Sequence, residues 1–194
     1  LLGCNNAHLV EEEGKWKTVG DPTEGALLAA GRKAGGDRER IEKEFPKRHE
    51  LPFDSDRKMS AVIRALPEGK LRAYLNGAPD VLLERCTQLY TREGVRPLAD
   101  EDRAHLVAQN TAMAEQALRV LGSARRDLEN HSPADLSADA VERDLVFVGL
   151  LGMIAVLRFV PYLGALFSGL QGRGGALSYA YGLEVGYVIT DNML

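Results

Sequence analysis

Phe53 and Lys58 stand five residues apart in the charged stretch 50–60, which runs directly into the apolar residues 61–63. A phenyl ring offers a face on which a planar base can stack, and a lysine offers a cation for a phosphate. The ordinary alternative is that Phe53 is a core residue at the start of a strand. The stretch therefore suggests nucleotide chemistry without establishing it.

Three further stretches accompany this one along the chain. They are residues 20–27 (GDPTEGAL), 77–80 (GAPD) and 117–121 (ALRVL). With residues 50–60 they follow the order and approximate spacing of motifs in one family. The chain resembles the nucleotide-binding (N) domain of P-type cation-transporting ATPases, and within them the calcium and sodium/potassium pump branch. The resemblance covers about residues 1–154.

The resemblance implies that the ligand is ATP, or Mg-ATP in the intact pump. Adenine would stack on Phe53, while Glu24 would accept a hydrogen bond from its amino group. Lys58 would lie beside the base and sugar, and Arg119 would reach a phosphate with its planar guanidinium. Gly77 would let the backbone approach the ligand closely, because it carries no Cβ.

Two of these residues have ordinary structural alternatives. Glu24 stands near a helix start, where an acid is favoured by the helix dipole whether or not a ligand binds. Arg119 opens an apolar strand, where it could simply be a rim residue. The sequence by itself leaves both alternatives open, and the resemblance favours the ligand roles.

Asn76 is a departure from the family pattern. The resemblance places a lysine that lines the adenine pocket directly before the Gly-Ala-Pro motif, and this chain has Asn76 there. An asparagine can form hydrogen bonds but carries no charge, so we expect weaker nucleotide binding than in relatives with lysine. The same departure supports an alternative function, a nucleotide-free interaction or regulatory module that retains the N-domain fold.

The chemistry of such pumps passes through an aspartyl phosphate in an Asp-Lys-Thr-Gly-Thr motif, which this chain does not contain. It also has no Gly-rich loop ending in Lys-Ser/Thr. We therefore expect no catalytic residue here, which counts against an enzyme that uses the tail as a complete second domain.

The resemblance implies that the chain binds ATP and presents it to the aspartate of a separate phosphorylation (P) domain, with the P and A domains of the pump as partners. Calcium is the ion suggested by the motif at residues 20–27.

Composition narrows the class of partner. The net charge is −4 and lysines and arginines are spread along the chain, which argues against a nucleic-acid surface. Cys4 and Cys86 lie far apart, which indicates reduced thiols in the cytosol, and the histidines are scattered singly, so no metal site is predicted. Because the chain opens without Met, we expect a fragment of a longer protein. The resemblance implies that this fragment is a cytoplasmic domain of an integral membrane protein.

The elements that must position these residues form an α+β fold, an antiparallel β-sheet flanked by helices. A β-hairpin over 61–66 and 70–75 carries one motif at each end, so antiparallel pairing would bring residues 53–58 close to 76–78. The other expected elements are a hairpin over 9–19, helices over 21–36, 37–50, 79–86 and 101–118, strands over 119–124 and 144–154, and a loop over 129–138.

The tail departs from the family after Ile154. Residues 155–158 (AVLR) replace the hinge Asp-Pro-Pro-Arg, and residues 184–192 resemble a family strand that ends in Thr-Gly-Asp-Asn but lack its glycine. This loss argues against a Mg²⁺ role for Asp191. We expect two parts, a nucleotide-binding domain over 1–154 and a degenerate remnant of the hinge and P domain over 155–194. The sequence of the second part also allows it to be poorly ordered.

Residues 150–170 are apolar enough to raise the question of a membrane span. Arg158 near the middle, Pro161 and three glycines count against one, and a buried strand explains the first part of the run. We therefore expect no direct membrane contact for residues 1–154.

Overall fold

The computed structural model describes residues 2–12, 15–128, 135–153, 179–180 and 183–184. The expected hinge at 155–158, the role of Asp191 and most of the apolar run over 150–170 lie outside these residues. The strands are β1 (His8–Glu12), β2 (Lys15–Val19), β3 (Lys47–Asp54), β4 (Met59–Ala65), β5 (Leu71–Gly77), β6 (Cys86–Thr91), β7 (Gly94–Pro97), β8 (Arg119–Leu128), β9 (Leu145–Met153), β10 (Tyr179–Ala180) and β11 (Leu183–Glu184). The helices are α1 (Pro22–Lys33), α2 (Arg38–Glu44), α3 (Pro79–Arg85), α4 (Asp100–Glu115) and α5 (Ala138–Val141), with a 3-10 turn, η1 (Pro67–Gly69).

Seven strands form the central sheet, in the order β3-β4-β5-β8-β9-β6-β7. All neighbouring pairs are antiparallel except β6 and β9, which are parallel. Strands β1 and β2 form a separate hairpin, as predicted, and β10 pairs with β11 in a third small sheet. The predicted α+β fold is confirmed, with one parallel pair inside a mostly antiparallel sheet.

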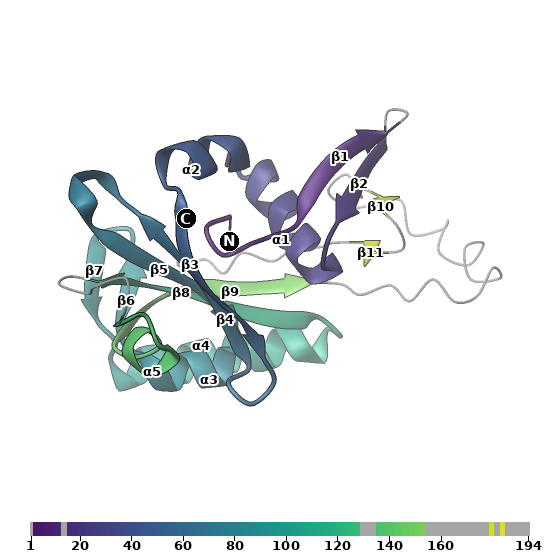
Figure 1. Cartoon of the computed structure of the whole chain (residues 1–194). Helices are drawn as coiled ribbons and strands as arrows, with labels where there is room; N and C mark the ends of the chain where they lie inside the picture. Colours follow the sequence, from purple (N-terminus) through teal and green to yellow (C-terminus); the bar gives the residue numbers. More distant parts are fainter. Residues whose placement is uncertain (1, 13–14, 129–134, 154–178, 181–182, 185–194) are drawn as a thin grey trace.

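Elements cover the two faces of the sheet differently. Helices α3 and α4 lie against one face, and α1, α2 and the β1–β2 hairpin lie on the other (Figure 1). A bulge in the β8–β9 pairing shifts the register between Ser123 and Ala124, which reverses the alternation of side chains along β9. As a result Phe147 packs with the α3 and α4 side, whereas Leu151 and Met153 pack against α1.

The predicted hairpin of β4 and β5 brings two motifs together. Ser60 pairs with Asn76 and Met59 with Gly77, and the Ala78 amide donates to the Lys58 carbonyl at 3.0 Å. The turn after Phe53 therefore touches the start of the Gly-Ala-Pro motif, as the sequence predicted.

Helix α1 starts as its sequence predicts. The Asp21 side chain accepts hydrogen bonds from the amides of Thr23 and Glu24, at 2.8 and 3.1 Å, and Pro22 occupies the first helical position. Beyond the last turn, Gly35 adopts a φ of +82°, which is inexpensive only for glycine. Asp21 and Gly35 thus mark the two ends of the helix, and Glu24 lies in its first turn.

The predicted helix over 37–50 is wrong in its second half. Helix α2 ends at Glu44, and the chain enters strand β3 at Lys47. Pro46 lacks an amide hydrogen and disfavours helical geometry in the residue before it, so the helix stops there. The following residues then pair with β4 as an edge strand, which brings Glu50 and Phe53 onto the sheet.

The β6–β7 hairpin was not predicted. Its short turn depends on Gly94, whose φ is +124°. Strand β6 pairs with β7 on one side and, in parallel, with the distant strand β9 on the other. Within the described part of the chain, no helix has the length and apolar character needed to cross a membrane.

Candidate functional site

A pocket of about 370 Å³ opens on the face of the sheet that carries α1. Its walls come from the N-terminal segment, the start of α1, the end of β3, and strands β4, β5 and β8. Five of the six predicted ligand residues line it, namely Glu24, Phe53, Asn76, Gly77 and Arg119. Residues that are as far apart as 24 and 119 in the sequence thus share one cavity.

Phe53 lies at the end of β3 with 67% of its surface exposed. The ring therefore does not belong to the core, which removes the ordinary alternative for this residue. Apolar side chains of Leu27, Val62 and Leu121 line the same pocket. An exposed aromatic ring beside an apolar wall can take up a flat ligand without any rearrangement of the core.

Glu24 projects from the first turn of α1 into the pocket lining. Its Oε2 accepts a hydrogen bond from the Asn6 amide at 3.1 Å, and its carbonyl accepts one from Asn5 Nδ2 at 2.7 Å. Because an ionised carboxylate offers about four acceptor positions, one bond to Asn6 leaves capacity for a ligand amino group.

Asn76 is buried and its amide bonds within the protein. Its Nδ2 donates to the Cys4 carbonyl at 2.8 Å, and its Oδ1 accepts from the Ser123 hydroxyl at 2.7 Å. The side chain thus ties the N-terminal segment to strands β5 and β8 beneath the pocket. A longer lysine at this position could not make the same pair of bonds, because an ammonium group has no acceptor.

Gly77 is required by a contact within the protein. A Cβ at this position would lie 2.6 Å from Met59 Cβ and 2.7 Å from the Lys58 carbonyl oxygen. This glycine therefore allows β5 to lie close to the start of β4. The predicted approach of its backbone to a ligand stays a prediction, and Gly77 lies in the pocket lining. The turn that follows Phe53 and ends at Lys58 can thus pack directly against the pocket wall at Gly77.

Lys58 is exposed, has a φ of +53°, and its amide donates to the Asp54 carbonyl at 2.7 Å. It does not line the pocket, so the structure does not bring it together with the other five residues. Arg119 is exposed at the first position of β8 and supplies the one cationic side chain among the lining residues. The positive charge of the pocket lining is therefore confined to the start of β8.

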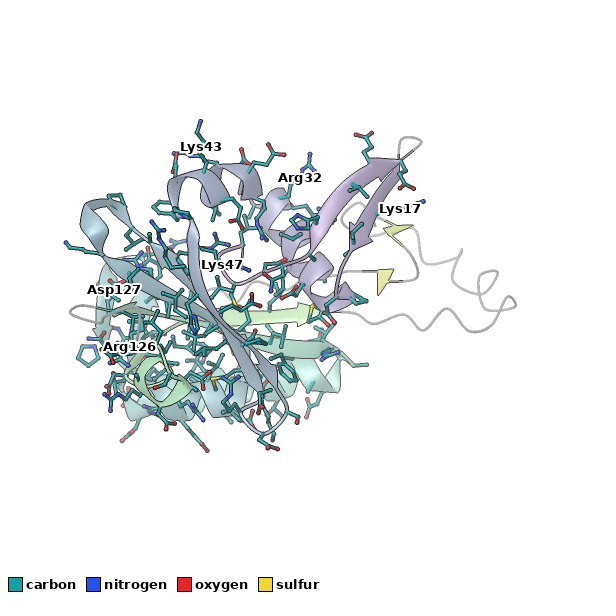
Figure 2. The ribbon with its side chains drawn as sticks, viewed as in Figure 1. Lys17, Arg32, Lys43, Lys47, Arg126 and Asp127 are labelled. Atoms are coloured by element: carbon teal, nitrogen blue, oxygen red, sulfur yellow. The ribbon has the colours of Figure 1, made fainter. Side chains whose placement is uncertain are left out.

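Sequence reasoning missed Asn6 and Glu50 as site residues. Asn6 Nδ2 donates to Glu50 Oε1, and Lys47 Nζ donates to Asn6 Oδ1 at 3.1 Å and to Glu50 Oε2 at 2.9 Å. Figure 2 shows Lys47 reaching from β3 toward the N-terminal segment. Burial raises the pKa of Glu50, but the bonds from Lys47 and Asn6 outweigh it and lower the pKa below its ordinary value. Asn6 carried no signal in the sequence, because only the fold places it beside β3.

Cys4 lies in the pocket wall with its Sγ 3.6 Å from the Ser60 carbonyl. Burial raises the pKa of this thiol, so it stays protonated and contributes packing rather than a reactive thiolate. Cys86 is also a free, buried thiol.

Comparison with known proteins agrees with this geometry. The family model described as "P-type ATPase, cytoplasmic domain N" matches residues 1–159. The chain is 38% identical over 152 residues to the calcium-transporting ATPase of Bacillus subtilis, a match that covers 78% of this chain and 17% of that protein. It is 36% identical over 152 residues to cation-transporting ATPase pma1 of Synechocystis sp., covering 78% and 16%. It is 34% identical over 152 residues to sodium/potassium exporting P-type ATPase cta3 of Schizosaccharomyces pombe, covering 77% and 14%.

The chain therefore spans less than a fifth of the length of these relatives. Its fold, the order of its motifs and the family model all point to the same part of them. The chain belongs to the P-type cation-transporting ATPases, and residues 1–159 match their cytoplasmic N domain.

Proposed function

We propose that the pocket binds ATP, with adenine against Phe53, and that the domain presents the terminal phosphate to an aspartate in a P domain not contained in this chain. The observation that carries the proposal is the exposed Phe53 ring in a cavity that Glu24 and Arg119 also line. Stacking of a base on an aromatic side chain is worth about 1–3 kcal/mol.

The other side chains would fix the orientation of the nucleotide. Glu24 would accept from the adenine amino group, and Arg119 would bind a phosphate at the edge of the pocket. Lys58 would act from outside the pocket lining, beside the base and sugar, because its long side chain starts in the turn next to Phe53. Asn76 would support the floor through Cys4 and Ser123 rather than contribute charge.

In the intact pump the ligand would be Mg-ATP, and the metal would come with the phosphates, as Mg²⁺ commonly does in phosphoryl-transfer sites. The P and A domains of the same pump would be the partners of this domain, and the parent protein would be embedded in a membrane. Since the chain has no Asp-Lys-Thr-Gly-Thr sequence, we expect it to bind ATP without hydrolysing it. A phosphate-release assay on this chain should give no signal above buffer.

The alternative is a nucleotide-free interaction or regulatory module that retains the same fold. Two observations favour it. The amide of Asn76 is already engaged within the protein, and the pocket lining holds Asp21, Glu24 and Glu50 but only Arg119 as a cation. A triphosphate would meet less positive charge here than in relatives with a lysine at this position.

A nucleotide titration separates the two functions. We would titrate ATP into the wild-type chain, Phe53→Ala and Val107→Ala, following amide chemical shifts and heat of binding. Val107 is a matched control, because it is also an exposed apolar residue but lies on α4, on the opposite face of the sheet. We expect saturable binding by the wild type, about 5- to 150-fold weaker binding by Phe53→Ala, and no change in Val107→Ala.

Two results of the titration would contradict this proposal. If the wild type shows no saturable shifts at millimolar ATP while its spectrum is that of a folded domain, the nucleotide-free module is the better account. Equal affinities for the wild type and Phe53→Ala would reject the stacking role.

A further inference from the structure

Glu142 is a buried acid outside the pocket that joins two arginines from distant parts of the chain. Its side chain is 0% exposed, whereas those of Arg57 and Arg85 are 24% and 35% exposed. Its Oε1 accepts from Arg57 Nη1, and its Oε2 accepts from Arg85 Nη1 at 3.0 Å. A fully buried carboxylate is kept charged only by such pairing, so both bonds are needed where it lies.

Arg57 closes the turn that follows Phe53. Its Nη2 donates to the Pro52 carbonyl at 2.7 Å, and its backbone amide donates to Asp54 Oδ1 at 2.9 Å. Arg57 therefore bonds to the residue on each side of Phe53, to Pro52 through its guanidinium and to Asp54 through its backbone amide.

Arg85 connects Glu142 to the second motif. It is the last residue of α3, the helix that begins at Pro79 directly after the Gly-Ala pair at 77–78. Its Nη1 also lies 3.4 Å from the Glu142 carbonyl. Glu142 thus links the turn beside the aromatic ring to the helix that follows Gly77, although it lies 85 residues from Arg57 and 57 from Arg85.

We propose that Glu142 is a positioning residue for the nucleotide pocket, acting through Arg57 on the end of β3, which carries Phe53, and on the turn that leads to Lys58. The proposal rests on the function proposed above. Glu142 does not line the pocket, so any effect of its removal on nucleotide affinity must pass through the residues that it contacts, Arg57 or Arg85. A role in stability alone would loosen the whole domain instead.

Hydrogen exchange tests the positioning role without any nucleotide. Glu142→Gln keeps the size of the side chain and removes its charge, and the partly exposed arginines can then be hydrated, so we expect the domain to fold. The amides of Lys58 and Ala78, which bond to Asp54 and Lys58 carbonyls, should exchange about tenfold faster. The Leu66 amide, which bonds to the Lys70 carbonyl at the far end of the same hairpin, should keep its wild-type rate. Equal acceleration of all three amides would overturn the proposal.

Nucleotide affinity gives the second readout. We would measure the ATP Kd of Arg57→Gln, Glu142→Gln and the double variant, with Asp102→Asn as control. Asp102 also pairs with an arginine, Arg96, but joins β7 to α4 away from the pocket. We expect each single variant to bind about five- to tenfold more weakly, the double variant to be no weaker than the singles, and the control to match the wild type.

Wild-type affinity in both folded single variants would overturn the positioning role. If the wild type itself binds no ATP, the proposed function fails, and the exchange rates of Lys58 and Ala78 still decide whether Glu142 holds the turn. Arg57→Gln keeps the test decisive should Glu142→Gln not fold, because the Arg57 side chain is partly exposed.

Discussion

The two faces of the central sheet differ in how their interiors are built. Against α3 and α4 lies one continuous apolar core that includes Leu82, Leu106 and Phe147. On the α1 side there are two smaller apolar clusters, around Leu27 and Leu28, and the pocket lies beside them. One face therefore supplies most of the apolar burial, while the other leaves apolar surface uncovered in a concave site.

On the face of the sheet that carries the pocket, buried hydrogen bonds and ion pairs supplement the smaller amount of apolar packing. Arg64 is fully buried there and donates to both carboxylate oxygens of Glu42, at 2.8 and 3.0 Å, and to the Gly3 carbonyl at 2.7 Å. Asn76 makes a similar tie to Cys4. These bonds hold the N-terminal segment over the sheet at fixed positions, which apolar contacts alone would specify less well.

The largest expected effect separates two phenylalanines. Phe147→Ala removes a fully buried ring from the apolar core and should lower the free energy of unfolding by about 3–5 kcal/mol. Phe53→Ala removes an exposed ring and should change it by less than about 0.5 kcal/mol. Urea denaturation of both variants measures the difference. Similar losses would show that the two faces contribute alike.

Asn76→Lys should change affinity and stability in opposite directions. Losing the bonds to Cys4 and Ser123 should lower the free energy of unfolding by about 1–3 kcal/mol, because buried partners are left unsatisfied. The added charge should raise ATP affinity several-fold. Calorimetric titration beside urea denaturation checks both, with Ser123→Ala as control for the lost hydrogen bond alone. No gain in affinity would contradict the view that Asn76 weakens nucleotide binding.

Glu24→Gln tests whether Glu24 makes the pocket selective for adenine over guanine. A carboxylate accepts from the amino group of adenine and repels the carbonyl oxygen that guanine carries at the same ring position, so the wild type should prefer ATP to GTP. The amide can donate as well as accept, which should reduce that preference about tenfold. The ratio of the two dissociation constants is the measurement. An unchanged ratio would assign Glu24 only to its bond with Asn6.

The smallest effect concerns pH. The hydrogen bond from Arg64 lowers the pKa of Glu42 from 4.5 to about 2. Because the folded-state pKa lies below the ordinary value, the ion pair stabilises the fold fully above pH 4.5 and less as the pH falls toward 2. The stability difference between wild type and Glu42→Gln should therefore shrink over that window. The effect is modest, since the Glu42 side chain is 40% exposed. A constant difference from pH 6 to 3 would be the contrary result.

Local signals in the sequence were sufficient for much of the fold. Asp21 and Pro22 predicted the start of α1, and two strand-forming runs on either side of a turn at 67–69 predicted the β4–β5 hairpin. Both signals act over a few residues. The same local reasoning failed at residues 45–50, where charge density favoured a helix and Pro46 ended it. It also missed the β6–β7 hairpin, in which β6 pairs in parallel with β9, a strand from a distant part of the chain.

The candidate site divides in the same way. Phe53, Glu24 and Arg119 could be named because each sits in a motif with a recognisable order. Asn6 and Glu50 could not, since neither residue type is unusual where it stands. Lys58 was expected with the others, but its place in the turn keeps it off the pocket lining.

The sequence by itself determined the family, the order of the motifs and the absence of the phosphorylatable aspartate motif, because these are properties of residue type and spacing. Only the tertiary structure decided that the Phe53 ring faces solvent, that Asn76 serves as an internal tie, and that Glu142 reaches the turn through Arg57. Burial and long-range hydrogen bonds depend on which strands pair, and strand pairing joins residues that local patterns cannot connect.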